Sequence, residues 1–318
     1  MTKSVKSLPD ASSAQSVSVP DLPVSDVADY FTLLKPRVMV LVTFTGIAGI
    51  WIAPGAIHWL QAIIAVLCIA LGSGAGAALN MWYERKSDRL MKRTRSRPLP
   101  AGRIDPDEAL NFAIFIAFLS VTIMALGVGI LAAILLGVAI VFYGVVYTIW
   151  LKPRTVQNIV IGGAAGALPP VIGWASVTHS LDWGAFAMFA LIFVWTPPHF
   201  WALALDRVDE YAQAKFPMLP NVAGDRATRV QIMLYSLALL PISLLPVVTN
   251  IAGWIYGITA CIASLYLIWR AWKVMQEQPK TRQARKLFGF SMLYLFVLFA
   301  VMMADASQPV TLLTRITQ

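Results

Sequence analysis

Three side chains that can offer oxygen atoms to a cation recur at every fourth position: Asn80, Glu84 and Asp88. On a helix, each would lie about 6 Å along the axis from the last and be rotated by only about 40°, so the three would share one face. Hard cations take oxygen ligands, and Mg²⁺ is usually held by one or two carboxylates together with substrate phosphates. The spacing therefore predicts a site for a magnesium-bound diphosphate.

Basic residues follow these acids directly: Lys92, Arg93, Arg95 and Arg97. Guanidinium groups pair bidentately with phosphate oxygens, and an ammonium group acts as a point charge. Taken alone, the segment fits equally well an exposed helix end with ordinary surface ion pairs. A second acidic segment favours the diphosphate site.

That second segment combines carboxylates, a phenol and cations: Asp206, Arg207, Asp209, Glu210, Tyr211 and Lys215. Two opposed carboxylate clusters can hold metal ions against one diphosphate and stabilise its charge as it departs. The spacing leaves open which of Asp206, Asp209 and Glu210 binds metal. The carbon left behind would be a cation, which needs a pocket that excludes water and presents aromatic faces.

Apolar helices must position these residues. The chain has 318 residues, of which 58% are hydrophobic and 13% charged, and its mean hydropathy is +0.70. These values exclude an ordinary water-soluble domain and predict an all-α polytopic membrane protein. We expect nine transmembrane helices, each near the length of about 20 residues that crosses a bilayer. Their approximate ranges are 38–53, 59–82, 111–126, 129–151, 159–177, 183–205, 230–249, 251–272 and 287–304.

The basic residues predict the orientation of these spans. All but Arg315 of the 25 Lys and Arg residues precede the first span or lie in alternate connections, which indicates that the N-terminus and both acidic segments are cytoplasmic. The net charge of +9 is thus explained by topology, and nucleic acid is not expected as a partner. We expect a disordered tail over 1–28, a membrane domain over 29–305 and a short tail over 306–318. Residues 1–28 lack the apolar core of a signal peptide, which favours a bacterial inner membrane.

Two proline pairs, Pro169-Pro170 and Pro197-Pro198, fall inside predicted spans. They predict interrupted helices beside the pocket in which the cation would react, because proline removes a helical hydrogen bond. His199 follows the second pair and is a further candidate for the site. Candidate aromatic residues for the chamber wall are Tyr143, Tyr147, Trp174, Trp195, Phe200 and Trp201.

Asn80, Glu84 and Asp88, followed by Met-Lys-Arg-Thr-Arg-Ser-Arg-Pro-Leu at 91–99, resemble the first signature of the UbiA superfamily of intramembrane prenyltransferases. More narrowly, they resemble its haem-farnesylating branch. Three further stretches agree, at 147–158, 161–174 and 195–220. The resemblance covers residues 30 to 305, and its motifs together are far more specific than the first alone.

The resemblance implies a nine-helix bundle with a cytoplasmic cap and Mg²⁺-dependent ionisation of farnesyl diphosphate. The implied acceptor is a vinyl group of haem b, the implied product is haem O, and its recipient is a haem A synthase or a terminal oxidase. The resemblance assigns Asn80, Glu84 and Asp88 to the first metal-diphosphate motif. The remaining site residues are Lys92, Arg93 and Arg97 as basic partners, Asp209 or Glu210 with Tyr211 and Lys215 in the second motif, and Lys152 and Asn158 in substrate binding. We hypothesise that His199 contacts haem, either by ligating the iron or by a hydrogen bond to a propionate.

The sequence departs from the superfamily pattern at two places. Glu84 stands where Asp is frequent, and the second motif reads Asp-Glu-Tyr rather than two Asp residues four apart. Two other functions fit parts of the sequence. An aromatic acceptor such as 4-hydroxybenzoate or a chlorophyll precursor is the alternative within the superfamily. A transporter is the alternative from another class, but the span interiors lack an acidic relay.

Overall fold

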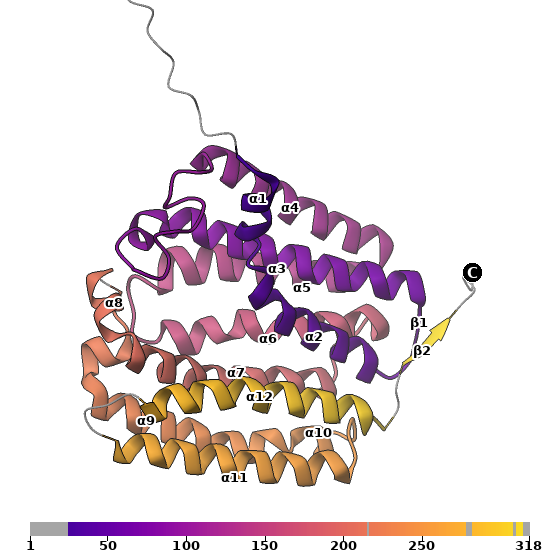
Figure 1. The fold of residues 1–318 in the computed structure, drawn as a ribbon. Coiled ribbons are helices and arrows are strands. Elements are labelled where there is room, and N and C mark those ends of the chain that lie inside the picture. The colour runs from indigo at the N-terminus through magenta and orange to yellow at the C-terminus, as the bar shows by residue number, and fades with distance from the viewer. Residues whose placement is uncertain (1–24, 215, 278–281, 308–309, 314–318) are drawn as a thin grey trace, which may run out of the picture.

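The fold is a bundle of long helices lying side by side (Figure 1). A computed structural model describes residues 25–214, 216–277, 282–307 and 310–313, so Lys215 lies outside the described residues. The helices are α1 (Val27–Leu33), α2 (Pro36–Ile52), α3 (Trp59–Asp88), α4 (Pro106–Gly127), α5 (Ile130–Val141), the π-helix η1 (Phe142–Leu151), α6 (Asn158–Thr178), α7 (Trp183–Asp206), α8 (Val208–Gln213), α9 (Leu219–Ser243), α10 (Leu245–Val248), α11 (Trp254–Gln276) and α12 (Arg282–Ala304).

The predicted all-α membrane fold is confirmed. Within the described ranges, eight helical segments are long and apolar enough to span a bilayer, and α1 with α2, bent by 52°, gives a ninth if the pair is one span. Helix α3 runs six residues past the predicted end at Trp82 and reaches Asp88. It therefore carries the whole first acidic motif. Helix α1 begins at Val27, inside the segment expected to be a tail.

The predicted interruption at the two proline pairs is wrong. Helix α6 continues through Pro169-Pro170 and α7 continues through Pro197-Pro198, and all four prolines are buried. In a membrane bundle, neighbouring helices and local adjustments compensate for the backbone groups that a proline leaves unpaired. Both helices therefore remain whole, and the prolines lie in packed interior.

Helices α2 and α6 approach so closely that glycine is required where they cross. A Cβ atom on Gly49 would overlap the backbone of Pro170, and one on Gly173 would overlap the carbonyl oxygen of Gly46. Small residues allow such approach, which is a main source of helix association in lipid. Helix α2 is thereby held in direct contact with α6.

Gly173→Ala is expected to destabilise the protein by about 1–3 kcal/mol, because the added methyl group forces the two backbones apart. Gly166→Ala is the matched control on the same helix, since nothing lies within 4 Å of a Cβ added there. Thermal unfolding in detergent should show a lower midpoint for the first variant only. Equal midpoints would contradict the assigned crossing.

Helix η1 is a π-helix of ten residues that continues α5 directly. Its wider turns are visible in the hydrogen bond from Lys152 N to Tyr147 O, five residues back, at 2.8 Å. Such segments are rare and occur frequently at functional sites. Here the π-helix sets the direction in which Thr148 and Lys152 leave the helix.

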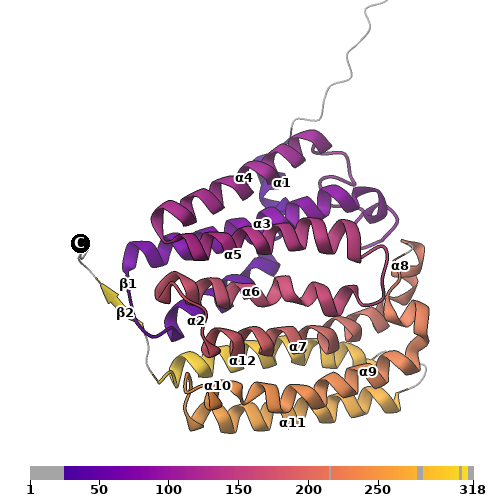
Figure 2. The ribbon, with the colours of Figure 1, turned by 180° about the vertical axis from the view of Figure 1, so that it is seen from behind.

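The two ends of the bundle differ. At one end, β1 (Ala56–His58) pairs in parallel with β2 (Thr311–Leu313), so the segment expected to be a C-terminal tail contributes a short strand. The connection from α3 to α4 and the short helix α8 lie at the other end, as both views show (Figures 1 and 2). The two acidic segments are therefore at the same end of the molecule.

Candidate active site

The first acidic motif forms a buried row on α3. Asn80, Glu84 and Asp88 are 3%, 4% and 1% exposed, on the single helix that the spacing predicted. Each has a basic partner. Lys152 Nζ donates to Glu84 Oε1 at 2.5 Å, and Arg97 Nη1 donates to Asp88 Oδ2 at 2.8 Å.

Asn80 connects Lys35, the residue directly before α2, to the π-helix η1. Lys35 Nζ donates to Asn80 Oδ1 at 2.8 Å, and Asn80 Nδ2 donates to Thr148 Oγ1 at 3.1 Å. Thr148 Oγ1 in turn donates to Tyr143 O at 2.8 Å. These hydrogen bonds fix the amide of Asn80 between three helices. Sequence reasoning did not include Lys35 or Thr148 in the site.

Lys35 has an unusual backbone conformation. Its φ of 50° and ψ of 57° lie in the left-handed region, which costs about 1–2 kcal/mol for a residue with a Cβ atom. The following Pro36 also disfavours the right-handed helical region at this position. Strain of this kind persists where the surrounding structure fixes it, and it occurs often at functional sites. A lysine directly before a proline at the start of a span is the sequence signal for this role.

Lys152 is charged although it is buried. Burial is the largest single effect and acts to lower the pKa of Lys152, but the charge and hydrogen bond of Glu84, together with Tyr211 and Tyr143, raise the pKa above its ordinary value. The Phe216 ring lies under the ammonium group, with Nζ 4.6 Å from the ring centroid. Tyr211 also interacts electrostatically with Lys152. Tyr211 of the second acidic segment and Phe216 therefore lie close to the cation that pairs with Glu84.

The carboxylates of the second segment make ion pairs of their own. Asp206 accepts from Arg285 Nε at 2.7 Å, and Glu210 accepts from Arg207 Nη1 at 2.8 Å. Asp209 is exposed. Across the described ranges, no three His, Cys, Asp or Glu side chains converge closely enough to hold a metal. The two acidic segments share one end of the bundle, but their carboxylates do not meet at one point.

The predicted basic residues differ in their positions. Lys92 and Arg93 are exposed, whereas Arg97 reaches Asp88. Asn158 is fully buried at the start of α6, where its Nδ2 donates to Thr155 O at 2.6 Å. Asn158 Oδ1 and Asp88 Oδ1 are buried without a hydrogen-bond partner. An oxygen set with an orphaned carboxylate atom suits a hard cation such as Mg²⁺.

The aromatic candidates fall into separate regions. Tyr143 and Tyr147 stack on η1, with ring centroids 5.5 Å apart, next to the first motif. Trp174 donates to Asp182 at the far end of α7, so it does not line the site. Trp195 stacks on His199, whose imidazole is buried between α7 and α12. Trp201 is buried, and Phe200 is partly exposed.

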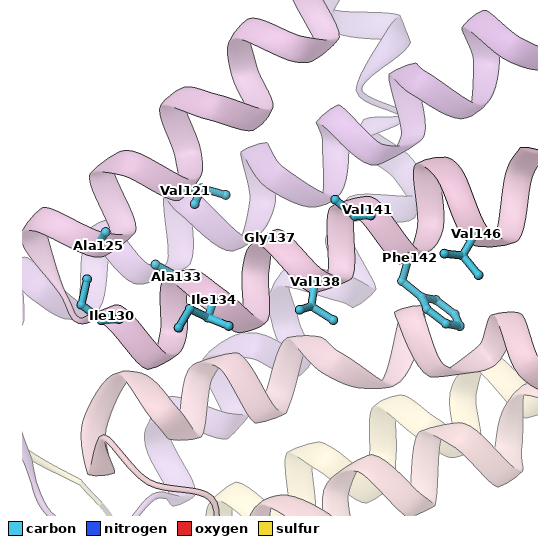
Figure 3. Close-up of a pocket in the computed structure, with 10 residues that line it drawn as sticks. All are labelled: Val121, Ala125, Ile130, Ala133, Ile134, Gly137, Val138, Val141, Phe142 and Val146. Carbon is cyan, nitrogen blue, oxygen red and sulfur yellow. The ribbon is translucent and has the colours of Figure 1, made fainter.

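An open groove on the outer face of α4, α5 and η1 is separate from this site (Figure 3). Only apolar residues line it, among them Val121, Ile134 and Phe142. It offers no group that can bind a diphosphate. Its composition matches a surface that faces lipid chains.

Known proteins resemble this chain over most of its length. The model of the UbiA prenyltransferase family matches residues 41–303. The protoheme IX farnesyltransferase of Brucella ovis is 49% identical over 281 residues, which cover 87% of this chain and 90% of that protein. The protein of the same name from Methylobacterium radiotolerans is 50% identical over 285 residues, which cover 89% and 90% of the two chains.

Solved structures share the fold at low sequence identity. A digeranylgeranylglyceryl phosphate synthase superposes with a TM-score of 0.73 at 18% identity, over 87% of this chain and 97% of that one. A UbiA homolog from Archaeoglobus fulgidus, bound to GPP and Mg²⁺, gives a TM-score of 0.61 at 18% identity, over 86% and 99% of the two chains.

Proposed function

Because the chain belongs to the UbiA prenyltransferase family, we propose that it transfers a farnesyl group from farnesyl diphosphate to a vinyl group of haem b. The transfer would release diphosphate and give haem O. Relatives with 49–50% identity carry the name protoheme IX farnesyltransferase, and they support this donor and acceptor. The observation that carries the proposal is the buried row of Asn80, Glu84 and Asp88, with a cation against each acid.

The row suits Mg²⁺ as the ion that accompanies the diphosphate. Asn80, Glu84 and Asp88 would hold it, and the orphaned Oδ1 atom of Asp88 supports that assignment. A UbiA homolog solved with GPP and Mg²⁺ supports the same pairing of ion and substrate. When bound, Mg²⁺ neutralises the negative charge that develops on the leaving diphosphate.

Lys152 and Arg97 would change partners when substrate binds. Each now neutralises one carboxylate of the row. Phosphate oxygens are strong acceptors for both cations, so a diphosphate competes with Glu84 and Asp88 for them. The carboxylates released in this way become available as metal ligands. Binding of the diphosphate and of the metal ion is therefore expected to be mutually favourable.

The second segment would complete the diphosphate site. We propose that Asp209 and Glu210 provide the second carboxylate set. Tyr211 would act beside Lys152, and Lys215 would add a further positive charge. The interaction of Tyr211 with Lys152 supports this placement. Asp206, which pairs with Arg285, would anchor α12 to the same segment.

The hydrocarbon half of the reaction would take place beside η1. Cleavage of the bond between C1 and the diphosphate oxygen leaves an allylic cation, which the faces of Tyr143 and Tyr147 can stabilise. The vinyl group then supplies its electron pair to C1. Water captures the second cation and loses a proton, which gives the hydroxyethylfarnesyl group. We propose a bacterial inner membrane with the site facing the cytoplasm, and a haem A synthase or terminal oxidase as recipient.

The test is incubation of the detergent-purified chain with haem b, farnesyl diphosphate and Mg²⁺. Mass spectrometry should detect haem with one added farnesyl group and one water, and omission of Mg²⁺ should remove this product. A parallel reaction with 4-hydroxybenzoate tests the alternative acceptor. Product from the aromatic acceptor alone would overturn haem as the substrate.

A further inference from the structure

The imidazole of His199 is held rigidly within the bundle. It is 8% exposed and lies between the Trp195 ring, at a centroid distance of 4.3 Å, and the Phe288 ring, at 4.6 Å. Both neighbours are nearly parallel to it, with interplanar angles of 19° and 23°. The ring can therefore meet a ligand only at its edge.

Hydrogen bonds determine which ring nitrogen carries the proton. His199 Nδ1 lies 2.7 Å from Ser291 Oγ, and Ser291 Oγ donates to Phe288 O at 2.7 Å. A serine hydroxyl has a single proton. Since that proton is directed to Phe288 O, we assign the hydroxyl as the acceptor from His199 and Nδ1 as the protonated nitrogen.

The other nitrogen, Nε2, then presents a lone pair. It makes no hydrogen bond to any described residue, and it is not sealed from solvent. A purely structural role would be a polar clamp between α7 and α12, as is common in membrane bundles. That role explains the bond from Trp195 Nε1 to Ser291 O at 2.8 Å and the bond at Nδ1. It leaves Nε2 without a function.

We infer that His199 Nε2 is an axial ligand of the haem iron and that Ser291 is its positioning residue. Histidines that bind metals usually donate their other N–H to a protein acceptor, which fixes the tautomer and the ring orientation. The same tautomer argues against a hydrogen bond to a haem propionate, because a neutral imidazole protonated at Nδ1 has no donor at Nε2. The inference rests on haem as the proposed acceptor.

The position of His199 fits the reaction. It precedes Asp206, the last residue of α7, by seven residues, which is about 10 Å along the helix axis. Helix α7 ends at Asp206, directly before α8, which lies at the same end of the bundle as the connection from α3 to α4 (Figure 1). An iron atom bound at Nε2 would hold the porphyrin against α7, about two helical turns from the end of that helix.

The test compares binding of haem b with binding of metal-free protoporphyrin IX, which has the same vinyl and propionate groups but no iron. The full chain in detergent should bind haem b more tightly, with a Soret band and a paramagnetic resonance spectrum typical of imidazole ligation. His199→Ala should weaken haem b binding by about 100-fold and leave protoporphyrin IX binding unchanged. His179→Ala, at the opposite end of the bundle, is the control.

Ser291→Ala should weaken haem binding by about tenfold and shift the Soret band, and Ser291→Thr should restore both, because it keeps the hydroxyl. A wild-type protein without preference for haem over protoporphyrin IX, or a His199→Ala variant with the wild-type spectrum, would overturn the inference. If His199→Ala does not fold, the preference of the wild-type protein for haem b over protoporphyrin IX and the spectrum of its haem complex still test the inference. If the same preparations still produce farnesylated haem, the proposed function stands even when the inference about His199 fails. Failure of the inference can therefore be distinguished from failure of the proposed function.

Discussion

Glu84→Gln is expected to lower prenyl transfer by about 10³-fold, because charge stabilisation by a bound metal contributes several kcal/mol to the transition state. The amide keeps the shape of the side chain and an oxygen that can accept from Lys152, so the chain should still fold, at a lower free energy of unfolding because the buried Lys152 ammonium loses its countercharge. Asp88→Asn should have a similar effect through the loss of the Oδ1 charge. Initial rates of farnesyl transfer at saturating substrate measure both.

Asp107→Asn is the matched control for these variants, because Asp107 is an exposed carboxylate at the start of α4. Its rate should equal that of the wild type. A cooperative unfolding transition above the assay temperature would show that the two site variants are folded. Full activity in Glu84→Gln and Asp88→Asn would place the metal-diphosphate site elsewhere.

Lys152→Met is expected to reduce the free energy of unfolding by about 3–5 kcal/mol, because it leaves the Glu84 carboxylate buried without a partner. Glu84 and Lys152 have 5% and 12% exposed side chains, so water does little to compensate the remaining charge. The double variant Glu84→Gln, Lys152→Met removes both charges and should regain most of the stability. It should remain inactive. Reversible unfolding in detergent, analysed as a double-mutant cycle, measures the coupling.

A second ion pair at the same end of the bundle provides the control. Arg285, with a 70% exposed side chain, pairs with Asp206. Exposed pairs contribute little, so Arg285→Gln should change the free energy of unfolding by less than about 1 kcal/mol. Equal losses for Lys152→Met and Arg285→Gln would contradict the buried ion pair.

Local features of the sequence predict the membrane-helical architecture and the grouping of Asn80, Glu84 and Asp88 on one helix. Hydropathy and four-residue spacing are local properties, and the rise and twist of a single helix convert them directly into a span or a shared face. Both acidic segments were therefore predicted at one end of the bundle, where the structure has them. The resemblance of the motifs predicted the family to which the chain belongs.

The hydrogen-bond and ion-pair partners of the polar groups depend on how the helices pack together. Glu84 pairs with Lys152, 68 residues away, because the wide turns of η1 direct that lysine toward α3. Lys35 donates to Asn80, 45 residues away, from a left-handed backbone conformation. The proline pairs remain inside whole helices because neighbouring helices pack around them. Such pairings depend on the rotation and approach of helices distant in sequence, which no local pattern of residues specifies.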